Sequence, residues 1–179
     1  MPINSAGILM YRHSGNGVEV LLVHPGGPFW HKRDLGAWSL PKGEYDDREN
    51  PEAAARREFN EELGVEALGP LEPLCEVRQR AGKIVRGYAP EGDPDVNRIR
   101  SNDVAIEWPP RSGRTISFPE IDRAGWFTLP IARRSSQAKR FFSIVLRYSG
   151  ETHRDVISER QLGEPRPRRV NVYPVFSML

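Results

Sequence analysis

Three glutamates, Glu58, Glu61 and Glu62, lie within a stretch of five consecutive positions, residues 58–62. On an α-helix, residues three and four apart have Cβ atoms about 5–6 Å from each other, so these carboxylates can reach one point in space. Carboxylate oxygens without His or Cys suit Mg²⁺ or Mn²⁺ rather than zinc. Because Mg²⁺ is usually completed by substrate phosphates, the spacing indicates a phosphorylated substrate.

The segment that carries the glutamates is predicted to be a helix from residue 51 to about residue 63. Asn50 can cap its start, Pro51 suits the first helical position, and Gly64 is a typical stop. An apolar residue recurs every fourth position and predicts a buried stripe made by Ala55, Phe59 and Leu63. The glutamates fall on the neighbouring flank, roughly 100° away. A plain solvated acidic face balancing Arg56 and Arg57 is the simplest alternative.

The other elements predict a mixed α/β fold in which hairpins surround this helix. One hairpin is expected from residues 6–12 and 18–24, and another from residues 74–80 and 83–89. Further expectations are short strands at 38–40, 114–118 and 126–129, an irregular segment at 90–114, a helix from 130 to about 148 and a last strand at 170–176.

The composition limits the class of protein. The 179 residues suit one domain, and no apolar run is long enough to span a membrane. Cys75, the single cysteine, excludes an internal disulfide, and the first ten residues lack a signal-peptide layout, so we expect a cytoplasmic protein. Residues 133–179 hold ten Lys or Arg and four Asp or Glu. This basic tail lacks interleaved aromatics, which disfavours a nucleic-acid partner and favours a solvated or subunit-contacting role.

The spacing around the glutamates resembles the box of the Nudix hydrolase family. That box is Gly-x5-Glu-x7-Arg-Glu-U-x-Glu-Glu-x-Gly-U, where U is bulky and apolar, and residues 43–65 fill every defined position. The resemblance runs from about residue 6 to 147, and residues 26–42 and 108–114 are similar to a bacterial subgroup of predicted nucleoside triphosphate pyrophosphohydrolases. We therefore expect a Nudix domain over residues 1–148 and a basic C-terminal extension over residues 149–179.

The resemblance implies a Nudix α/β/α sandwich with a mixed β-sheet, and hydrolysis of a nucleoside diphosphate linked to another group. It implies two or more Mg²⁺ or Mn²⁺ ions held by Glu58, Glu61, Glu62 and the backbone carbonyl of Lys42. Arg57 and Glu49 would orient that set, and Gly43 would give its loop backbone freedom. The general base stays open between Glu61 or Glu62 acting directly and a distant carboxylate, for which Glu120 is slightly preferred to Glu107.

Candidate substrate contacts lie outside the box. Phe29 and Trp30 could stack a base or cover a sheet edge. Four cations could hold phosphates or be ordinary surface charges: Lys32, Arg33, Arg111 and Arg114. His24 and His31 lack metal-ligand spacing and are expected to be structural, and Trp38 is expected in the core.

The expected function is metal-dependent hydrolysis of a small-molecule nucleotide. A nucleoside triphosphate or a dinucleoside polyphosphate is preferred, and nucleotide sugars stay open. The alternative is a catalytically silent nucleotide-binding module, which the complete set of box glutamates disfavours. Processing of RNA 5′ ends is a third option that rests on the basic tail alone. The same tail could reach a second subunit in a homodimer.

Overall fold

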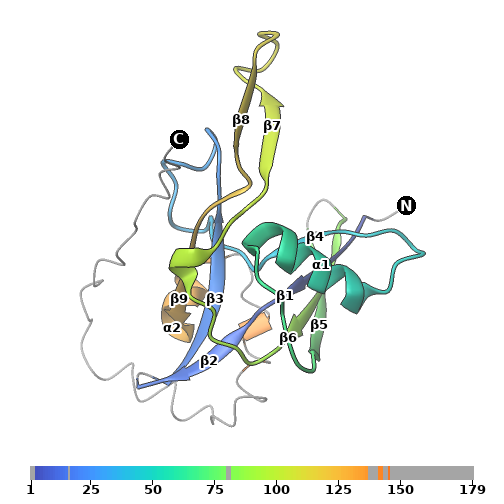
Figure 1. The fold of residues 1–179 in the computed structure, drawn as a ribbon, viewed down its shortest axis with the longest axis vertical. Coiled ribbons are helices and arrows are strands. Elements are labelled where there is room, and N and C mark those ends of the chain that lie inside the picture. Colours follow the sequence, from blue (N-terminus) through green and yellow to red (C-terminus); the bar gives the residue numbers. More distant parts are fainter. Residues whose placement is uncertain (1–2, 16, 80–81, 137–140, 143–144, 146–179) are drawn as a thin grey trace.

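The computed structural model describes residues 3–15, 17–79, 82–136, 141–142 and 145 (Figure 1). The elements in chain order are β1 (Asn4–Ile8), β2 (Tyr11–Ser14), β3 (Gly17–Pro25), β4 (Lys42–Glu44), α1 (Pro51–Leu63), β5 (Glu72–Arg78), β6 (Ile84–Ala89), η1 (Val96–Arg98), β7 (Asp103–Glu107), β8 (Thr115–Pro119), β9 (Ile121–Thr128) and α2 (Leu129–Ser135). No helix within the described part of the chain is long and apolar enough to cross a membrane.

Two sheets form the body of the molecule. The first has the order β4-β1-β6-β5, in which β1 and β6 run parallel and the other pairs are antiparallel. The second has the order β2-β3-β9 and is antiparallel. The predicted α/β fold with a mixed sheet is confirmed.

Helix α1 packs on the first sheet through the predicted stripe. Ala55, Phe59 and Leu63 are fully buried, and they share a core cluster with Ile8 of β1 and Leu21 of β3. Burying a side chain such as Phe59 stabilises the fold by about 1.5–3 kcal/mol. This stripe fixes the rotation of α1, and so it decides which way the flank with the glutamates faces.

A second core cluster lies between β3, β9 and α2, and it contains Trp38, which is 5% exposed, as expected. His24 is also fully buried, in line with a structural role. Its Nδ1 lies 2.7 Å from Asp122 Oδ1 and its Nε2 lies 2.6 Å from the Arg33 carbonyl oxygen. Through these contacts β3 anchors the loop that follows it.

Several predicted strands were placed wrongly. The first hairpin is correct for β2 and β3, but residues 4–8 form β1 in the other sheet. The chain passes from one sheet to the other at residues 9–10, where it has no glycine or proline. The sequence pattern of residues 6–12 therefore predicts a single strand. Residues 38–40 form isolated bridges only, and the next strand begins at Lys42. The hairpin predicted over 74–89 is confirmed as β5 and β6.

The expectation of an irregular segment at 90–114 was wrong, because it contains β7. The strands expected at 114–118 and 126–129 correspond to β8 and to the end of β9. The helix predicted at 130–148 is interrupted rather than continuous: α2 ends at Ser135 and Ser136 is extended, but residues 141, 142 and 145, the other described positions of this range, are helical again. Residues 146–179, with the strand expected at 170–176 and the basic extension, lie outside the described residues.

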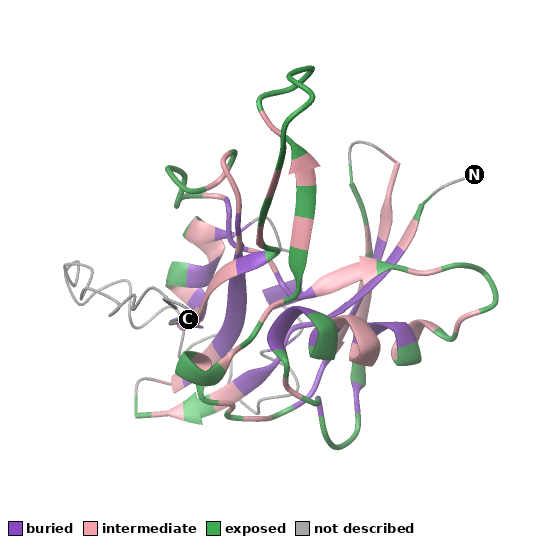
Figure 2. Cartoon of the chain, turned by 45° about the horizontal axis from the view of Figure 1, so that its top comes forward, coloured by how far each residue is buried: buried purple, intermediate pink, exposed green. Residues whose placement is uncertain are grey.

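Strands β7 and β8 form a separate two-stranded sheet, here called the hairpin arm (residues 103–119). It projects away from the body (Figure 1), and its residues are half-buried or exposed (Figure 2). Val104 pairs with Phe118 and Ile106 with Ile116, which gives the arm one apolar face. A two-stranded hairpin alone is marginally stable, so contacts with the body must support it.

Candidate active site

Helix α1 is fixed at both ends of the carboxylate segment. The Asn50 side chain accepts hydrogen bonds from the backbone N–H groups of Glu52 and Ala53 at 2.8 and 3.3 Å. Gly64 adopts the left-handed conformation with φ of 65°, and its N–H donates to the Asn60 carbonyl. A cap such as Asn50 stabilises a helix by about 1 kcal/mol. The predicted start and end of this helix are confirmed.

Strand β4 lies against the carboxylate flank of α1. The Lys42 backbone N–H donates to both carboxylate oxygens of Glu62 at 3.3 Å. A Cβ atom on Gly43 would lie 1.9 Å from the carboxyl group of Glu58. The expected reason for this glycine was therefore wrong: Gly43 is not among the residues with positive φ, and it is needed because Glu58 fills the space of a side chain.

Arg57 donates hydrogen bonds to three glutamates of the box, Glu49, Glu58 and Glu61. Its Nε and Nη2 donate to the two carboxylate oxygens of Glu49 at 2.9 and 3.0 Å. Its Nη1 donates to Glu58 at 2.6 Å and to Glu61 at 3.1 Å. Hydrogen bonding from Arg57 holds the pKa of Glu49 below its usual value. The structure thus brings together Arg57, Glu49 and two of the three expected metal ligands.

Glu62 is the most perturbed carboxylate. Only 6% of it is exposed, and its pKa is raised to about 8, chiefly because the carboxyl group is buried. The charges of Glu120 and Glu58 act in the same direction, and Lys42 opposes them. The pKa of Glu58 is also raised by burial, with hydrogen bonding from Arg57 opposing and the charges of Glu61 and Glu120 adding to it.

These carboxylates form a donor set that fits a divalent cation, although it is not pre-assembled. Among the described residues, no three carboxylate, imidazole or thiolate side chains are gathered as a ready metal site. Instead the guanidinium of Arg57 lies between Glu58 and Glu61 and supplies positive charge there. Buried acidic oxygens and the glycine cradle beneath Glu58 suit Mg²⁺ or Mn²⁺, which require hard oxygen ligands.

The two candidates for a distant general base are far apart. Glu120 lies at the foot of the hairpin arm, and its charge acts on both Glu58 and Glu62. Glu107 lies at the outer end of β7, where its carboxylate accepts a hydrogen bond from Gly113 N–H at 2.7 Å. Glu107 pairs with Thr115, which lies five positions before Glu120, so the two carboxylates are separated by about 17 Å along the strand. The geometry therefore favours Glu120.

The expected substrate contacts fall in two places. Phe29, Trp30 and Lys32 lie in the loop after β3, and the guanidinium of Arg33 lies 5.9 Å from the Trp30 ring centroid. Arg111 lies at the outer turn of the hairpin arm, away from the carboxylates. Sequence reasoning missed Trp108, whose ring contacts Phe29 with a centroid distance of 4.6 Å. Their separation in sequence left no signal of this contact.

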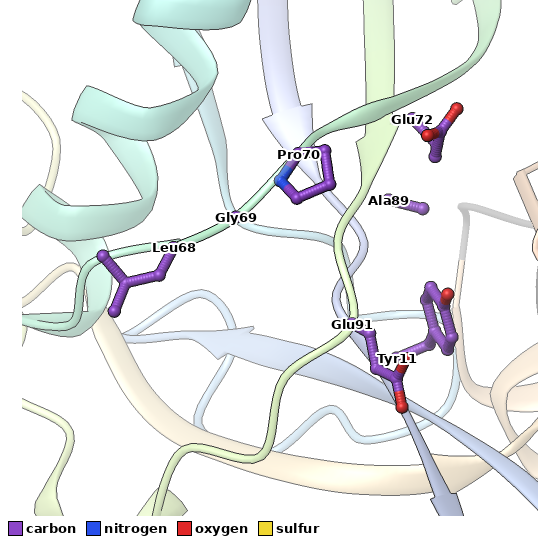
Figure 3. Close-up of a pocket in the computed structure, with 7 residues that line it drawn as sticks. All are labelled: Tyr11, Leu68, Gly69, Pro70, Glu72, Ala89 and Glu91. Carbon is purple, nitrogen blue, oxygen red and sulfur yellow. The ribbon is translucent and has the colours of Figure 1, made fainter.

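A separate hollow of about 350 Å³ lies on another part of the surface (Figure 3). It is lined by Tyr11, Leu68, Gly69, Pro70, Glu72, Ala89 and Glu91. Burial, followed by the charges of Glu91 and Glu72, raises the pKa of the Tyr11 hydroxyl. None of its lining residues belongs to the box, so this hollow is not the candidate active site.

Comparison with known proteins agrees with this geometry. The family model described as "NUDIX domain" matches residues 1–143, and the chain belongs to the Nudix hydrolase family. The RNA pyrophosphohydrolase of Bartonella henselae is 26% identical over 165 residues, which cover 82% of this chain and 89% of that protein. The RNA pyrophosphohydrolase of Pseudomonas aeruginosa is 44% identical over 52 residues, and this match spans only 28% of this chain and 33% of the relative.

Solved structures share the fold. A Caenorhabditis elegans Ap4A hydrolase binary complex superposes with a TM-score of 0.54 at 22% identity, covering 82% of this chain and 96% of that one. The Nudix domain of Shewanella oneidensis NrtR, complexed with ADP ribose, gives a TM-score of 0.53 at 16% identity and covers 90% of each chain. These similarities confirm the Nudix fold expected from the box.

Proposed function

We propose that this chain is a divalent-cation-dependent pyrophosphohydrolase that cleaves the phosphoanhydride bridge of a nucleoside polyphosphate. The observation that supports it is the placement of Glu58 and Glu62 against β4, where the Lys42 N–H holds Glu62 and Gly43 leaves room for Glu58, within range of the charge of Glu120. In addition to burial, the charge of Glu120 raises the pKa of both helix carboxylates. A bound cation would relieve this repulsion, and substrate phosphates would complete its coordination.

The metal-binding residues in this proposal are Glu58, Glu61, Glu62 and the backbone carbonyl of Lys42. Mg²⁺ or Mn²⁺ held there, as two or more ions with substrate, supplies electrophilic polarisation of the phosphoryl group. Arg57 positions the set, because one guanidinium holds Glu49, Glu58 and Glu61 at once. The N–H of Lys42 orients the Glu62 carboxylate from the side of the sheet.

We assign Glu120 as the general base. Its carboxylate accepts a proton from the attacking water while the water oxygen bonds to phosphorus. The bridging P–O bond breaks, and its electron pair leaves with the departing phosphate. Glu61 and Glu62 are the alternatives for this proton transfer, since both lie on the same face of the site.

Two kinds of substrate follow from different observations. The filled box favours a nucleoside triphosphate or a dinucleoside polyphosphate as a small-molecule substrate. The curated relatives named RNA pyrophosphohydrolase favour a 5′-triphosphorylated RNA end, which would make nucleic acid a partner after all. A homodimer and a cytoplasmic location stay predictions from the sequence.

The test is a panel of dATP, diadenosine tetraphosphate, ADP-ribose and a short 5′-triphosphorylated RNA, with phosphate and pyrophosphate detected. We expect hydrolysis with Mg²⁺ or Mn²⁺ and none with EDTA. Glu62→Gln should reduce turnover by orders of magnitude, whereas Glu66→Gln, at an exposed position after α1, should not. Binding of these nucleotides without hydrolysis by the wild type would instead identify the silent module.

A further inference from the structure

Strand β4 carries the backbone groups of Lys42 that face the box, yet it is a short strand. It has three residues and lies at the edge of the first sheet, beside α1 (Figure 1). Its neighbour in that sheet is β1, with which it pairs antiparallel, Ala6 opposite Gly43 and Gly7 opposite Lys42. The orientation of the Lys42 carbonyl and N–H therefore depends on how β1 holds this strand.

The hydrogen bonds between β1 and β4 decide which way the Lys42 groups point. The Ile8 N–H donates to the Pro41 carbonyl at 3.0 Å. In an antiparallel ladder, hydrogen-bonded pairs alternate with pairs that exchange no hydrogen bond. Gly43 therefore turns its N–H and C=O toward β1, and the intervening Lys42 turns both of its groups away from β1. The bond from the Lys42 N–H to Glu62 agrees with this alternation, so the Lys42 carbonyl leaves the strand on the side of the box.

The glycine beside Lys42 makes this orientation easy to lose. Position 43 requires glycine, because Glu58 fills the space that a side chain would occupy. Glycine also permits more backbone conformations than any other residue. A strand of three residues with a partner on one side has few ladder bonds to restrict that freedom. A further restraint on the Gly43 peptide would therefore help to fix the Lys42 carbonyl.

Ser5 of β1 provides such a restraint. Its side chain is fully buried, and its Oγ donates to the Gly43 carbonyl at 2.6 Å. Gly7 lies on the same face of β1, two residues further on. A Cβ atom on Gly7 would lie 2.4 Å from the Pro41 carbonyl oxygen and 2.5 Å from the Lys42 Cβ. One hydroxyl and one missing side chain of β1 thus hold the segment on both sides of Lys42.

Packing alone does not require a serine at position 5. Alanine would fill nearly the same space in the sheet, and it would bury no hydroxyl group. A buried hydroxyl costs free energy unless it is hydrogen-bonded, and here the Gly43 carbonyl is its partner. The specific contribution of Ser5 is therefore the direction that its hydroxyl gives to the Gly43 peptide.

We propose that Ser5 is a positioning residue of the cation site. Its hydroxyl fixes the Gly43 carbonyl toward β1 and so keeps the Lys42 carbonyl and N–H directed at the box. The proposal rests on the proposed function, because the Lys42 carbonyl is a ligand only if the box binds a cation. Removing a group that orients a metal ligand typically weakens metal binding about tenfold to a hundredfold.

The experiment measures Mn²⁺ binding to the full chain by isothermal titration in wild type, Ser5→Ala and Ser14→Ala. Ser14→Ala is the matched control, because the Ser14 hydroxyl also donates to a glycine carbonyl, that of Gly17 at 3.1 Å, but in the second sheet. We expect the dissociation constant for Mn²⁺ to rise about tenfold to a hundredfold in Ser5→Ala and to stay at the wild-type value in Ser14→Ala. Urea unfolding verifies that each variant is folded under the conditions of the titration.

A second measurement needs no metal. Hydrogen exchange of single amides is followed by NMR in EDTA, and the Lys42 amide is compared with the Phe59 amide within α1. Ser5→Ala should accelerate exchange at Lys42 more than at Phe59, because the change loosens β4 locally. Equal acceleration at both amides would mean that Ser5 only stabilises the fold, and it would overturn the positioning role.

The two proposals fail in different ways. Mn²⁺ binding by wild type that is unchanged in Ser5→Ala would overturn the role of Ser5 and leave the proposed function in place. Absence of Mn²⁺ binding by the wild type, with and without dATP, would refute the proposed function, and with it the cation site that Ser5 supports.

Discussion

Glu62→Gln should make the metal-free protein less sensitive to pH. The pKa of Glu62 is raised from 4.5 to about 8 in the folded state, chiefly by burial. Unfolding exposes the carboxyl group, so between these pH values the unfolded chain binds fewer protons than the folded chain. The free energy of unfolding of the wild type therefore falls as pH rises from about 4.5 to about 8.

The magnitude follows from the two pKa values. The slope approaches about 1.4 kcal/mol per pH unit, and the loss between pH 4.5 and pH 7 amounts to about 3 kcal/mol. Glutamine has no such titration and can still accept a hydrogen bond from the Lys42 N–H. The difference in unfolding free energy between Glu62→Gln and wild type should thus grow in favour of the variant by about 3 kcal/mol over that range.

The assay is urea unfolding in EDTA at several pH values, with midpoints compared at a constant slope. Taking the difference between variant and wild type removes the contributions of other titrating groups. Glu66→Gln serves as the control, because its side chain is exposed and should leave the wild-type pH dependence in place. Parallel pH profiles for Glu62→Gln and wild type would refute the reasoning, since they would mean that Glu62 is not buried as a costly charge.

Two further predictions concern the placement of the other carboxylates. Gly43→Ala puts a Cβ atom 1.9 Å from the Glu58 carboxyl group, so Glu58 must move. We expect kcat to fall about a hundredfold or more, because a displacement near 1 Å can have such an effect. Gly15→Ala is the matched control, because a Cβ atom there meets no atom within 4 Å. Glu120→Gln should lower kcat by about 10²–10⁴ while Mn²⁺ still binds, as measured by isothermal titration. Glu107→Gln should retain activity, and equal losses in both glutamate variants would show that proximity to the box is not what matters.

The parts of this molecule that could be predicted from sequence are those set by local chemistry. Asn50, the apolar stripe and Gly64 define α1 within one continuous segment, so its bounds and its buried face were predicted correctly. The long-range pairings were not accessible in this way. Residues 4–14 divide between two sheets because β1 pairs with β6 and β2 with β3, and no residue within that stretch marks the change.

The same distinction holds within the site. The contact of Arg57 with Glu49 was expected, since both positions belong to one short motif. The approach of Glu120 to Glu58 depends on how the hairpin arm leaves β9, and the contact of Phe29 with Trp108 depends on the fit of Gly27 against Phe118. Each joins segments about 60 to 90 residues apart in the sequence. Only the folded sheet brings them together.

The box thus combines a stably packed helix, α1, with a buried carboxylate, Glu62, that destabilises the folded state when it is ionised. The stripe of α1 and the cap at Asn50 hold the helix against the sheet whether or not the flank is charged. That support keeps Glu62 buried despite the free-energy cost of burying its ionised carboxylate. Arg57 does not offset this cost, because its guanidinium contacts Glu49, Glu58 and Glu61 instead. A carboxylate kept in this state gains most from a cation, so binding of Mn²⁺ should stabilise wild type more than Glu62→Gln, and the gain should increase with pH as the metal replaces a proton.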